Sequence, residues 1–283
     1  MRNIFVRLAI NSSTVDKQLS ARLIAKVVSY RKTINAWKCH LLRGSNQDLC
    51  RQELLENLDD NSVYIYMDWA MKWLPEKYRE DQSEFFGKRG LSWHISVIVR
   101  KNTQWTSVND QSESENKFVE DDNGHLHLII VHVFDHCVQD SKAVVSILHD
   151  VLMRVKHVDG NIKNAYVRSG NAGCYHSAQT ILSLPQISYE SMIHVCRIDF
   201  CDSQCGKGPC DRYAAVIKSH ARCFINEERN VTTANEFVEA TYASNGIRGV
   251  FAYETRLNKD SSNFSPQFPK IRRVFSARNS SEH

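Results

Sequence analysis

Alternating side chains predict a buried strand near the end of the first quarter of the chain. Within residues 62–67, aliphatic side chains alternate with two tyrosines, and a period of two is typical of a β-strand. The stretch is rich in β-branched and aromatic residues, which pleated and largely buried strands favour. It runs directly into Asp68. A carboxylate there is costly to bury unless it is paired, hydrogen-bonded or bound to a metal. One interpretation is that Asp68 caps the following turn or pairs with a nearby Arg or Lys. The other is that it is the first acid of a metal-dependent site.

Apolar spacing predicts a helical arm over residues 1–61. Hydrophobic residues recur at helical intervals in two segments, 19–28 and 47–58. Basic residues are scattered along the first of them. An amphipathic, solvated arm that packs on the core is the simpler interpretation, and an arm that contacts nucleic-acid phosphates is the alternative.

The rest of the chain alternates between strand and helix patterns. Further strands are predicted at 91–101, 125–135, 165–168 and 192–200, with a weak one at 249–253. Helices are predicted at 142–156 behind Asp140 and Ser141 as caps, within 171–184 ending before Pro185, at 210–228, and at 232–242 behind Thr232 or Thr233. Residues 72–90 have the composition of a loop or a broken helix.

This order of elements predicts the fold class. Three consecutive strands suit antiparallel pairing, and strands that follow helices suit parallel crossovers. We therefore expect an α/β protein with a mixed five-stranded sheet, helices on both of its faces, and the strand of Asp68 at its centre. That arrangement is ribonuclease H-like.

Composition divides the chain into three parts: a helical arm (1–61), a core (62–242) and a basic tail (243–283). The core carries a polar, acidic loop insertion at 102–124. We expect this insertion and the tail beyond about residue 256 to be disordered, because neither can bury enough apolar surface to offset the entropy of ordering.

Charge and cysteine content limit the function classes. The net charge of +4 is mild and is concentrated after residue 255, where six basic residues stand against two acids. A strong autonomous DNA binder would supply more cations. The nine cysteines are an odd number, and no secretory h-region or membrane-length apolar run occurs, so we expect an intracellular protein, nuclear or cytoplasmic, with reduced thiols and no membrane partner.

Two clusters carry the residue types of a zinc site. Cys201 and Cys205 have nearly the spacing of zinc ligands, but the chain has no tight Cys-x-x-Cys pair. His125 and His127 would share one strand face. Free thiols and partly exposed strand histidines are the favoured interpretations, so zinc is not expected.

A series of motifs carries a family resemblance. In chain order they are Asp-Trp-Ala-Met-Lys-Trp-Leu-Pro (68–75), Phe-Gly-Lys-Arg-Gly (86–90), Gln-Asp-Ser (139–141), Ser-Gly-Asn-Ala-Gly-Cys-Tyr-His (169–176) and Gly-Lys-Gly-Pro-Cys-Asp (206–211). Over roughly residues 60–240 the chain resembles the catalytic core of DDE-type transposases and retroviral integrases, and specifically a group of transposon-derived animal proteins.

The resemblance implies a two-metal site for phosphodiester chemistry. Carboxylates hold two Mg²⁺ or Mn²⁺ ions, one activating the attacking oxygen and the other stabilising the leaving oxygen. Asp68 corresponds to the first acid and Asp211 to the third. The second acid is replaced by Gly170, which has no ligand atom, and Asn171 offers only a neutral amide oxygen. Asp199 and Asp202 could lend a carboxylate from outside the expected position.

The resemblance also implies DNA as the partner. Lys207 lies in a basic loop between two glycines before Asp211, and in this fold that loop would place it beside a scissile phosphate; the alternative is a glycine-permitted turn into the following helix. The residues expected to contact nucleic acid are Lys72, Lys88, Arg89, Lys207, Arg212, Lys218, Arg272 and Arg273. We expect a nucleic-acid-processing core whose cleavage or strand transfer is impaired by Gly170. The alternative is a domesticated, inactive nucleic-acid-binding or scaffold protein. A second copy of the chain, in a homo-oligomer, is a further candidate partner.

Overall fold

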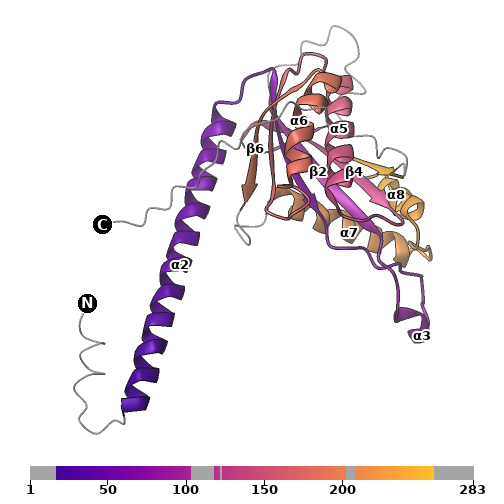
Figure 1. Ribbon diagram of the computed structural model, residues 1–283. Helices are drawn as coiled ribbons and strands as arrows, with labels where there is room; N and C mark the ends of the chain where they lie inside the picture. The colour runs from indigo at the N-terminus through magenta and orange to yellow at the C-terminus, as the bar shows by residue number, and fades with distance from the viewer. Residues whose placement is uncertain (1–16, 103–117, 122, 202–207, 258–283) are drawn as a thin grey trace. The chain divides into compact units, whose positions relative to one another are not determined.

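A computed structural model describes residues 17–102, 118–121, 123–201 and 208–257 (Figure 1). Contacts divide the chain into two compact units, one containing the N-terminal helix and the other containing residues 59–200 and 208–257. The strands are β1 Ser62–Trp69, β2 Ser92–Lys101, β3 Val119–Glu120, β4 His125–Phe134, β5 Asn164–Gly170, β6 His194–Cys201 and β7 Val250–Glu254. The helices are α2 Lys17–Glu56, α3 Gln82–Phe85, α5 Ser141–Val158, α6 Ala178–Ser191, α7 Pro209–Asn226 and α8 Ala234–Tyr242.

The described strands form one mixed sheet, as predicted. Its order is β3-β4-β2-β1-β5-β6, and β7 pairs with β4. β1 is antiparallel to β2 and parallel to β5, and β2 is antiparallel to β4. The prediction that the strand of Asp68 is central is therefore confirmed.

The predicted number of five strands was wrong, because β3 and β7 bring the described sheet to seven. β3 lies within the predicted acidic insertion and pairs with β4 opposite Leu126 and His127. β7 runs parallel to β4 over residues 129–133, so a strand of the sheet lies within the predicted basic tail (243–283). Residues 103–117, 122 and 258–283, on which the expectation of disorder rests, lie outside the described residues.

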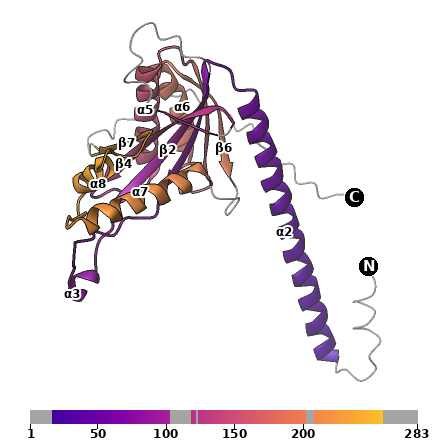
Figure 2. The ribbon, with the colours of Figure 1, turned by 180° about the vertical axis from the view of Figure 1, so that it is seen from behind.

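Helices cover both faces of the sheet. Figure 1 shows α5 and α6 in front of it, and Figure 2, from behind, brings α7 and α8 to the front. On the α5 face, Val63 and Ile65 of β1 belong to one buried cluster with Val144 and Leu148 of α5. On the other face, the Trp93 ring lies 5.1 Å from the ring of Phe237 in α8. Two covered faces explain why residues 62–67 are all buried.

Local capping signals place the starts of α5 and α8. The Asp140 carboxylate accepts a hydrogen bond from the Ala143 N–H (3.0 Å), as a cap of α5. Of the two threonines proposed to cap α8, Thr233 is the cap, and it forms a capping box with Glu236.

The predicted end of α6 before Pro185 was wrong. α6 continues to Ser191 through this proline. Pro185 is exposed, and Ile181, whose carbonyl loses its helical donor, is exposed as well. Solvent can hydrate that carbonyl, while Ser183 and Ile187 bury the helix face on either side.

The predicted helical arm is one continuous helix within the described residues rather than two segments. α2 spans 40 residues. Gly44 stands near its middle, but a single glycine costs only ~1 kcal/mol relative to alanine in a helix. Residues 1–16 lie outside the described part of the chain.

A buried ion pair generates the first testable prediction. Arg100 of β2 and Asp159, after α5, are both buried, and Nη1 lies 2.5 Å from Oδ2. Asp159→Ala removes this acceptor from a buried guanidinium, so we expect the free energy of unfolding to fall by ~3–5 kcal/mol in urea denaturation. Asp199→Ala, which breaks the exposed pair with Arg197, is the matched control and should cost ~0–1 kcal/mol. Equal losses in the two variants would contradict this account.

Candidate functional site

The site begins where the covered part of β1 ends. Asp68 follows the buried run of β1 and is half-buried. It pairs in the sheet with Ile95 of β2. The buried thiol of Cys210, in the first turn of α7, donates to the carbonyl oxygen of that same Ile95 (3.8 Å). This contact brings the start of α7 to the strand position beside Asp68.

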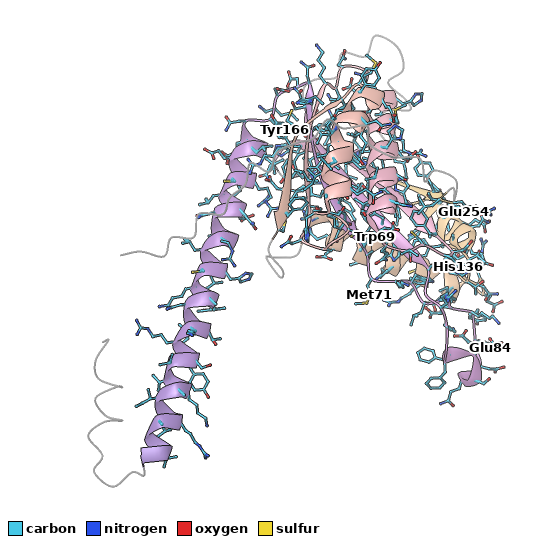
Figure 3. The ribbon with its side chains drawn as sticks, in the orientation of Figure 1. Trp69, Met71, Glu84, His136, Tyr166 and Glu254 are labelled. Atoms are coloured by element: carbon cyan, nitrogen blue, oxygen red, sulfur yellow. The ribbon has the colours of Figure 1, made fainter. Side chains whose placement is uncertain are left out.

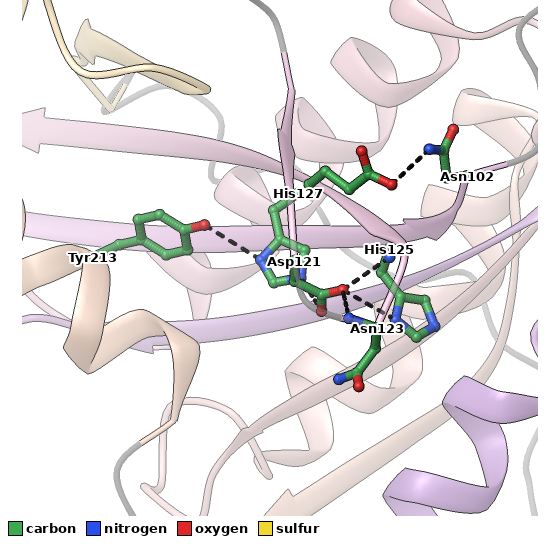
Figure 4. A network of polar contacts seen from close by, with 7 residues as sticks. Asn102, Asp121, Asn123, His125, His127 and Tyr213 are labelled. Carbon is green, nitrogen blue, oxygen red and sulfur yellow. Dashed lines mark hydrogen bonds and ion pairs between the residues drawn. The ribbon is translucent and has the colours of Figure 1, made fainter.

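A second contact fixes α7 one turn further along (Figure 4). Tyr213 Oη lies 3.3 Å from Nδ1 of His127, and Nε2 of His127 lies 3.2 Å from Asp121. Burial lowers the pKa of His127, so its ring is neutral at pH 7. A neutral ring satisfies both partners when Nε2–H donates to Asp121 and Nδ1 accepts from the Tyr213 hydroxyl. The strand histidine therefore serves to dock α7.

Asp211 lies in the first turn of α7, behind Gly208 and Pro209. A helix N-terminus favours a carboxylate at this place, because its free N–H groups carry partial positive charge. The charge of Asp211 acts on Asp68: burial first, and then repulsion from Asp211, raise the pKa of Asp68 to about 6. The two acids thus lie close enough to interact.

Gly170, the third position of the site, ends β5 on the other side of β1. Ser169 pairs with Met67, which sets Gly170 level with Asp68. A Cβ built on Gly170 would meet Asp68 Oδ1 at 3.8 Å and nothing nearer. The glycine does not adopt a left-handed conformation, so its backbone accepts a side chain. The structure therefore brings together two acids and a glycine.

The remaining ligand candidates are placed as follows. Asn171 follows Gly170 and is exposed. Asp199 of β6 accepts from Arg197 Nε at 2.7 Å. Lys207 and Asp202 lie outside the described residues, as does Cys205 of the cysteine cluster. No group of three His, Cys, Asp or Glu side chains among the described residues is arranged to hold a metal ion.

The residues predicted to contact nucleic acid differ in their surroundings. Lys72, Arg89 and Arg212 are exposed. Lys88 instead forms an ion pair with Glu80 and donates to the carbonyl oxygen of Pro75, which engages its ammonium group within the protein. Arg272 and Arg273 lie outside the described residues. Their contacts with nucleic acid stay predictions.

Lys218 and Arg222 form a basic ridge on α7, of which the sequence analysis identified only Lys218. The Nζ of Lys218 lies 5.5 Å from the centroid of the Trp93 ring. Burial first, and then the charge of Arg222, lower the pKa of Lys218, while Asp211 raises it. Residues 211, 218 and 222 are spaced at helical intervals. That spacing could have identified Arg222 from the sequence.

A buried tyrosine of the motif at residues 169–176 lies beside the site, and the sequence analysis gave it no role. Tyr175 Oη lies 3.1 Å from Nε2 of His94. Burial, followed by the charge of Asp68, raises the pKa of Tyr175 well above its ordinary value, so the phenol stays protonated. Figure 3 labels Trp69, the last residue of β1, and Met71, which follows the strand and is exposed.

The raised pKa of Asp68 gives a pH prediction. The folded state holds this proton up to about pH 6, whereas the unfolded chain releases it near 3.8. Stability contributed by Asp68 is therefore greatest below pH 4 and falls as the pH rises to about 6. Asp68→Asn should remove this slope and raise the free energy of unfolding at pH 7.5 by roughly 1–2 kcal/mol after allowance for solvent screening. Urea denaturation across pH 4–8 measures it, and destabilisation by Asp68→Asn at pH 7.5 would contradict it.

None of the helices in the described part of the chain combines the length and the apolar character needed to cross a lipid bilayer.

Comparison with known proteins identifies a family. The profile of a family described as a domain of unknown function (DUF8701) matches residues 47–280. Neither the curated proteins nor the solved structures gave a match. Because the family match extends over most of the chain, this protein belongs to the DUF8701 family.

Proposed function

We propose that residues 59–257 contain a ribonuclease H-like core of the transposase and integrase type. The strand order supports this proposal. Three antiparallel strands (β1, β2 and β4) come first in the chain, and helices α5 and α6 then lead to β5 and β6 on the opposite side of β1. β1 is therefore central. Its end, at Asp68, is adjacent to the end of β5 at Gly170 and to the start of α7 at Asp211.

The donor set at the end of β1 fits one divalent cation. Asp68 and Asp211 offer hard carboxylate oxygens, which suit Mg²⁺ or Mn²⁺ with water completing the coordination. Burial first, and then repulsion from Asp211, raise the pKa of Asp68 to about 6, so a cation between the two acids would relieve that repulsion. A bound cation would supply charge neutralisation to an oxygen of a phosphate group.

Within the described residues, the position that would supply a third carboxylate for the second cation of a two-metal site is Gly170. The observation that carries this conclusion is the Cβ position of Gly170, 3.8 Å from Asp68 Oδ1. A side chain at this place would reach the site, and none is present. Loss of even an indirect partner of a metal ligand lowers activity or affinity ~10–100-fold, so we infer that cleavage is impaired.

The adjacent ridge of α7 suits an anionic ligand. Lys218 and Arg222 lie close enough for the charge of one to lower the pKa of the other, and a phosphate group between them would relieve that repulsion. Arg212, at the start of α7, is exposed. We therefore propose that the protein binds a nucleic-acid backbone along α7, with one divalent cation at the acid pair, and does not cut it efficiently.

Mn²⁺ binding tests the acid pair. Titration of the full chain, followed by the electron paramagnetic resonance signal of free Mn²⁺, should give one site that Asp68→Asn abolishes. Protons compete for Asp68 below about pH 6, so affinity should fall there. Gly170→Asp should tighten Mn²⁺ binding by about tenfold or more, because loss of a residue that only supports a metal ligand already lowers metal affinity ~10–100-fold. Gly173→Asp, at another glycine with open space around its Cβ, is the matched control.

Nicking of a labelled duplex in Mn²⁺ tests the chemistry. The unmodified protein should nick little, and Gly170→Asp should nick more. Robust nicking by the unmodified protein that Asp68→Ala abolishes would overturn the proposal of impaired cleavage. Absence of any duplex binding at low salt would instead favour the scaffold alternative, since phosphate contacts strengthen as salt is lowered.

A further inference from the structure

Helix α2 carries a row of large apolar side chains that are open to solvent. The members of this stripe are Leu23, Val27, Tyr30, Ile34, Trp37 and Leu41, each between 39% and 63% exposed. Single exposed apolar residues need no explanation, but a continuous row of them marks an interaction surface. We call this row the α2 stripe.

The spacing of the α2 stripe is that of a coiled-coil seam. Successive members are four, three, four, three and four residues apart, which is the alternation of a and d positions in a heptad. Val27, Ile34 and Leu41 occupy a positions. Two of these three, Val27 and Ile34, are β-branched, and β-branched residues at a favour a two-stranded assembly, so the geometry suits a single partner helix. The seam ends at Gly44, the next d position, and spans about 27 Å at 1.5 Å per residue.

Charged residues beside the stripe specify the partner. The flanking e and g positions include Lys26, Arg31 and Lys38, and residues 17–47 contain no Asp or Glu. In a parallel pair of identical helices, Lys26 of one copy would face Arg31 of the other, and an antiparallel pair would again oppose basic residues. Like charges across a seam disfavour a second copy. A helix with acidic residues at the same positions would be attracted.

We infer that the α2 stripe binds an acidic, amphipathic helix of another protein in a two-stranded coiled coil. Apolar side chains of the partner cover the stripe, and its Glu or Asp side chains pair with the flanking Lys and Arg residues. This inference rests on α2 alone and is independent of the proposed function of the core.

A designed peptide provides the probe. It is a fluorescently labelled helix of about four heptads, with Ile at a, Leu at d and Glu at every e and g position, so that it repels itself at neutral pH. A second peptide carries Lys at those e and g positions. Fluorescence anisotropy with the full chain should show binding of the acidic peptide only, and the binding should weaken as salt is raised.

Two neighbouring valines provide matched variants. Val27 lies in the stripe, whereas Val28 lies at a b position outside it, and both are exposed. Val27→Ser should weaken binding of the acidic peptide about tenfold, as expected for loss of a buried valine. Val28→Ser changes the same side chain and helix propensity and should leave the affinity within about twofold.

Several results would overturn the inference. They are equal effects of the two valine variants, equally tight binding of the basic peptide, and failure of the acidic peptide to bind. A chain that is dimeric in sedimentation and stays so with the acidic peptide would show that a second copy covers the stripe. Binding of anionic lipid vesicles or duplex DNA that is lost in Val27→Ser, without peptide binding, would assign the stripe to those partners instead.

Discussion

The structure of the core depends on one constraint, the burial of β1 on both faces. Residues 62–67 are all buried, and such a strand is stable only if apolar layers cover both sides of the sheet. Helices α5 and α6 provide one layer and α7 and α8 the other. Where this cover ends, Asp68 is half-buried at the end of an apolar strand. The position of the candidate site thus follows from the extent of the core.

Acidic and basic groups are gathered in separate places, the acids where α7 begins beside β1 and the bases further along α7. Burial shifts the pKa of Asp68 and of Lys218 most, and repulsion from Asp211 and from Arg222, respectively, shifts them further in the same direction. Such pairs are unfavourable for the protein alone and become favourable when a ligand of opposite charge lies between them. A divalent cation and a phosphate satisfy both at once, which is the physical basis of the proposed function.

The helix that carries these charges is held by specific polar contacts as well as by packing. The thiol of Cys210 contacts the backbone of β2, and Tyr213 contacts β4 through His127 and Asp121. Buried polar contacts contribute little net stability but penalise alternative arrangements, because their groups would then be unsatisfied. They explain why the first turn of α7 has a defined position beside β1. Helix α2, in contrast, has an apolar row that the described structure leaves open to solvent.

The sequence by itself determined the elements whose signals are local. Alternation indicated β1, Asp140 indicated the start of α5, and a threonine cap at 232 or 233 indicated the start of α8, because strand periodicity and capping act within a few residues. The order of elements was enough to place β1 at the centre of the sheet. Only the tertiary structure decided features that depend on distant residues. The pairing of β3 and β7 needs the edge of β4, and the passage of α6 through Pro185 depends on which side of that helix faces solvent. The distance of Gly170 from the Asp68 carboxylate is likewise set by contacts between segments that the sequence keeps apart. The engagement of Lys88 by Glu80 depends on how the loop between them folds.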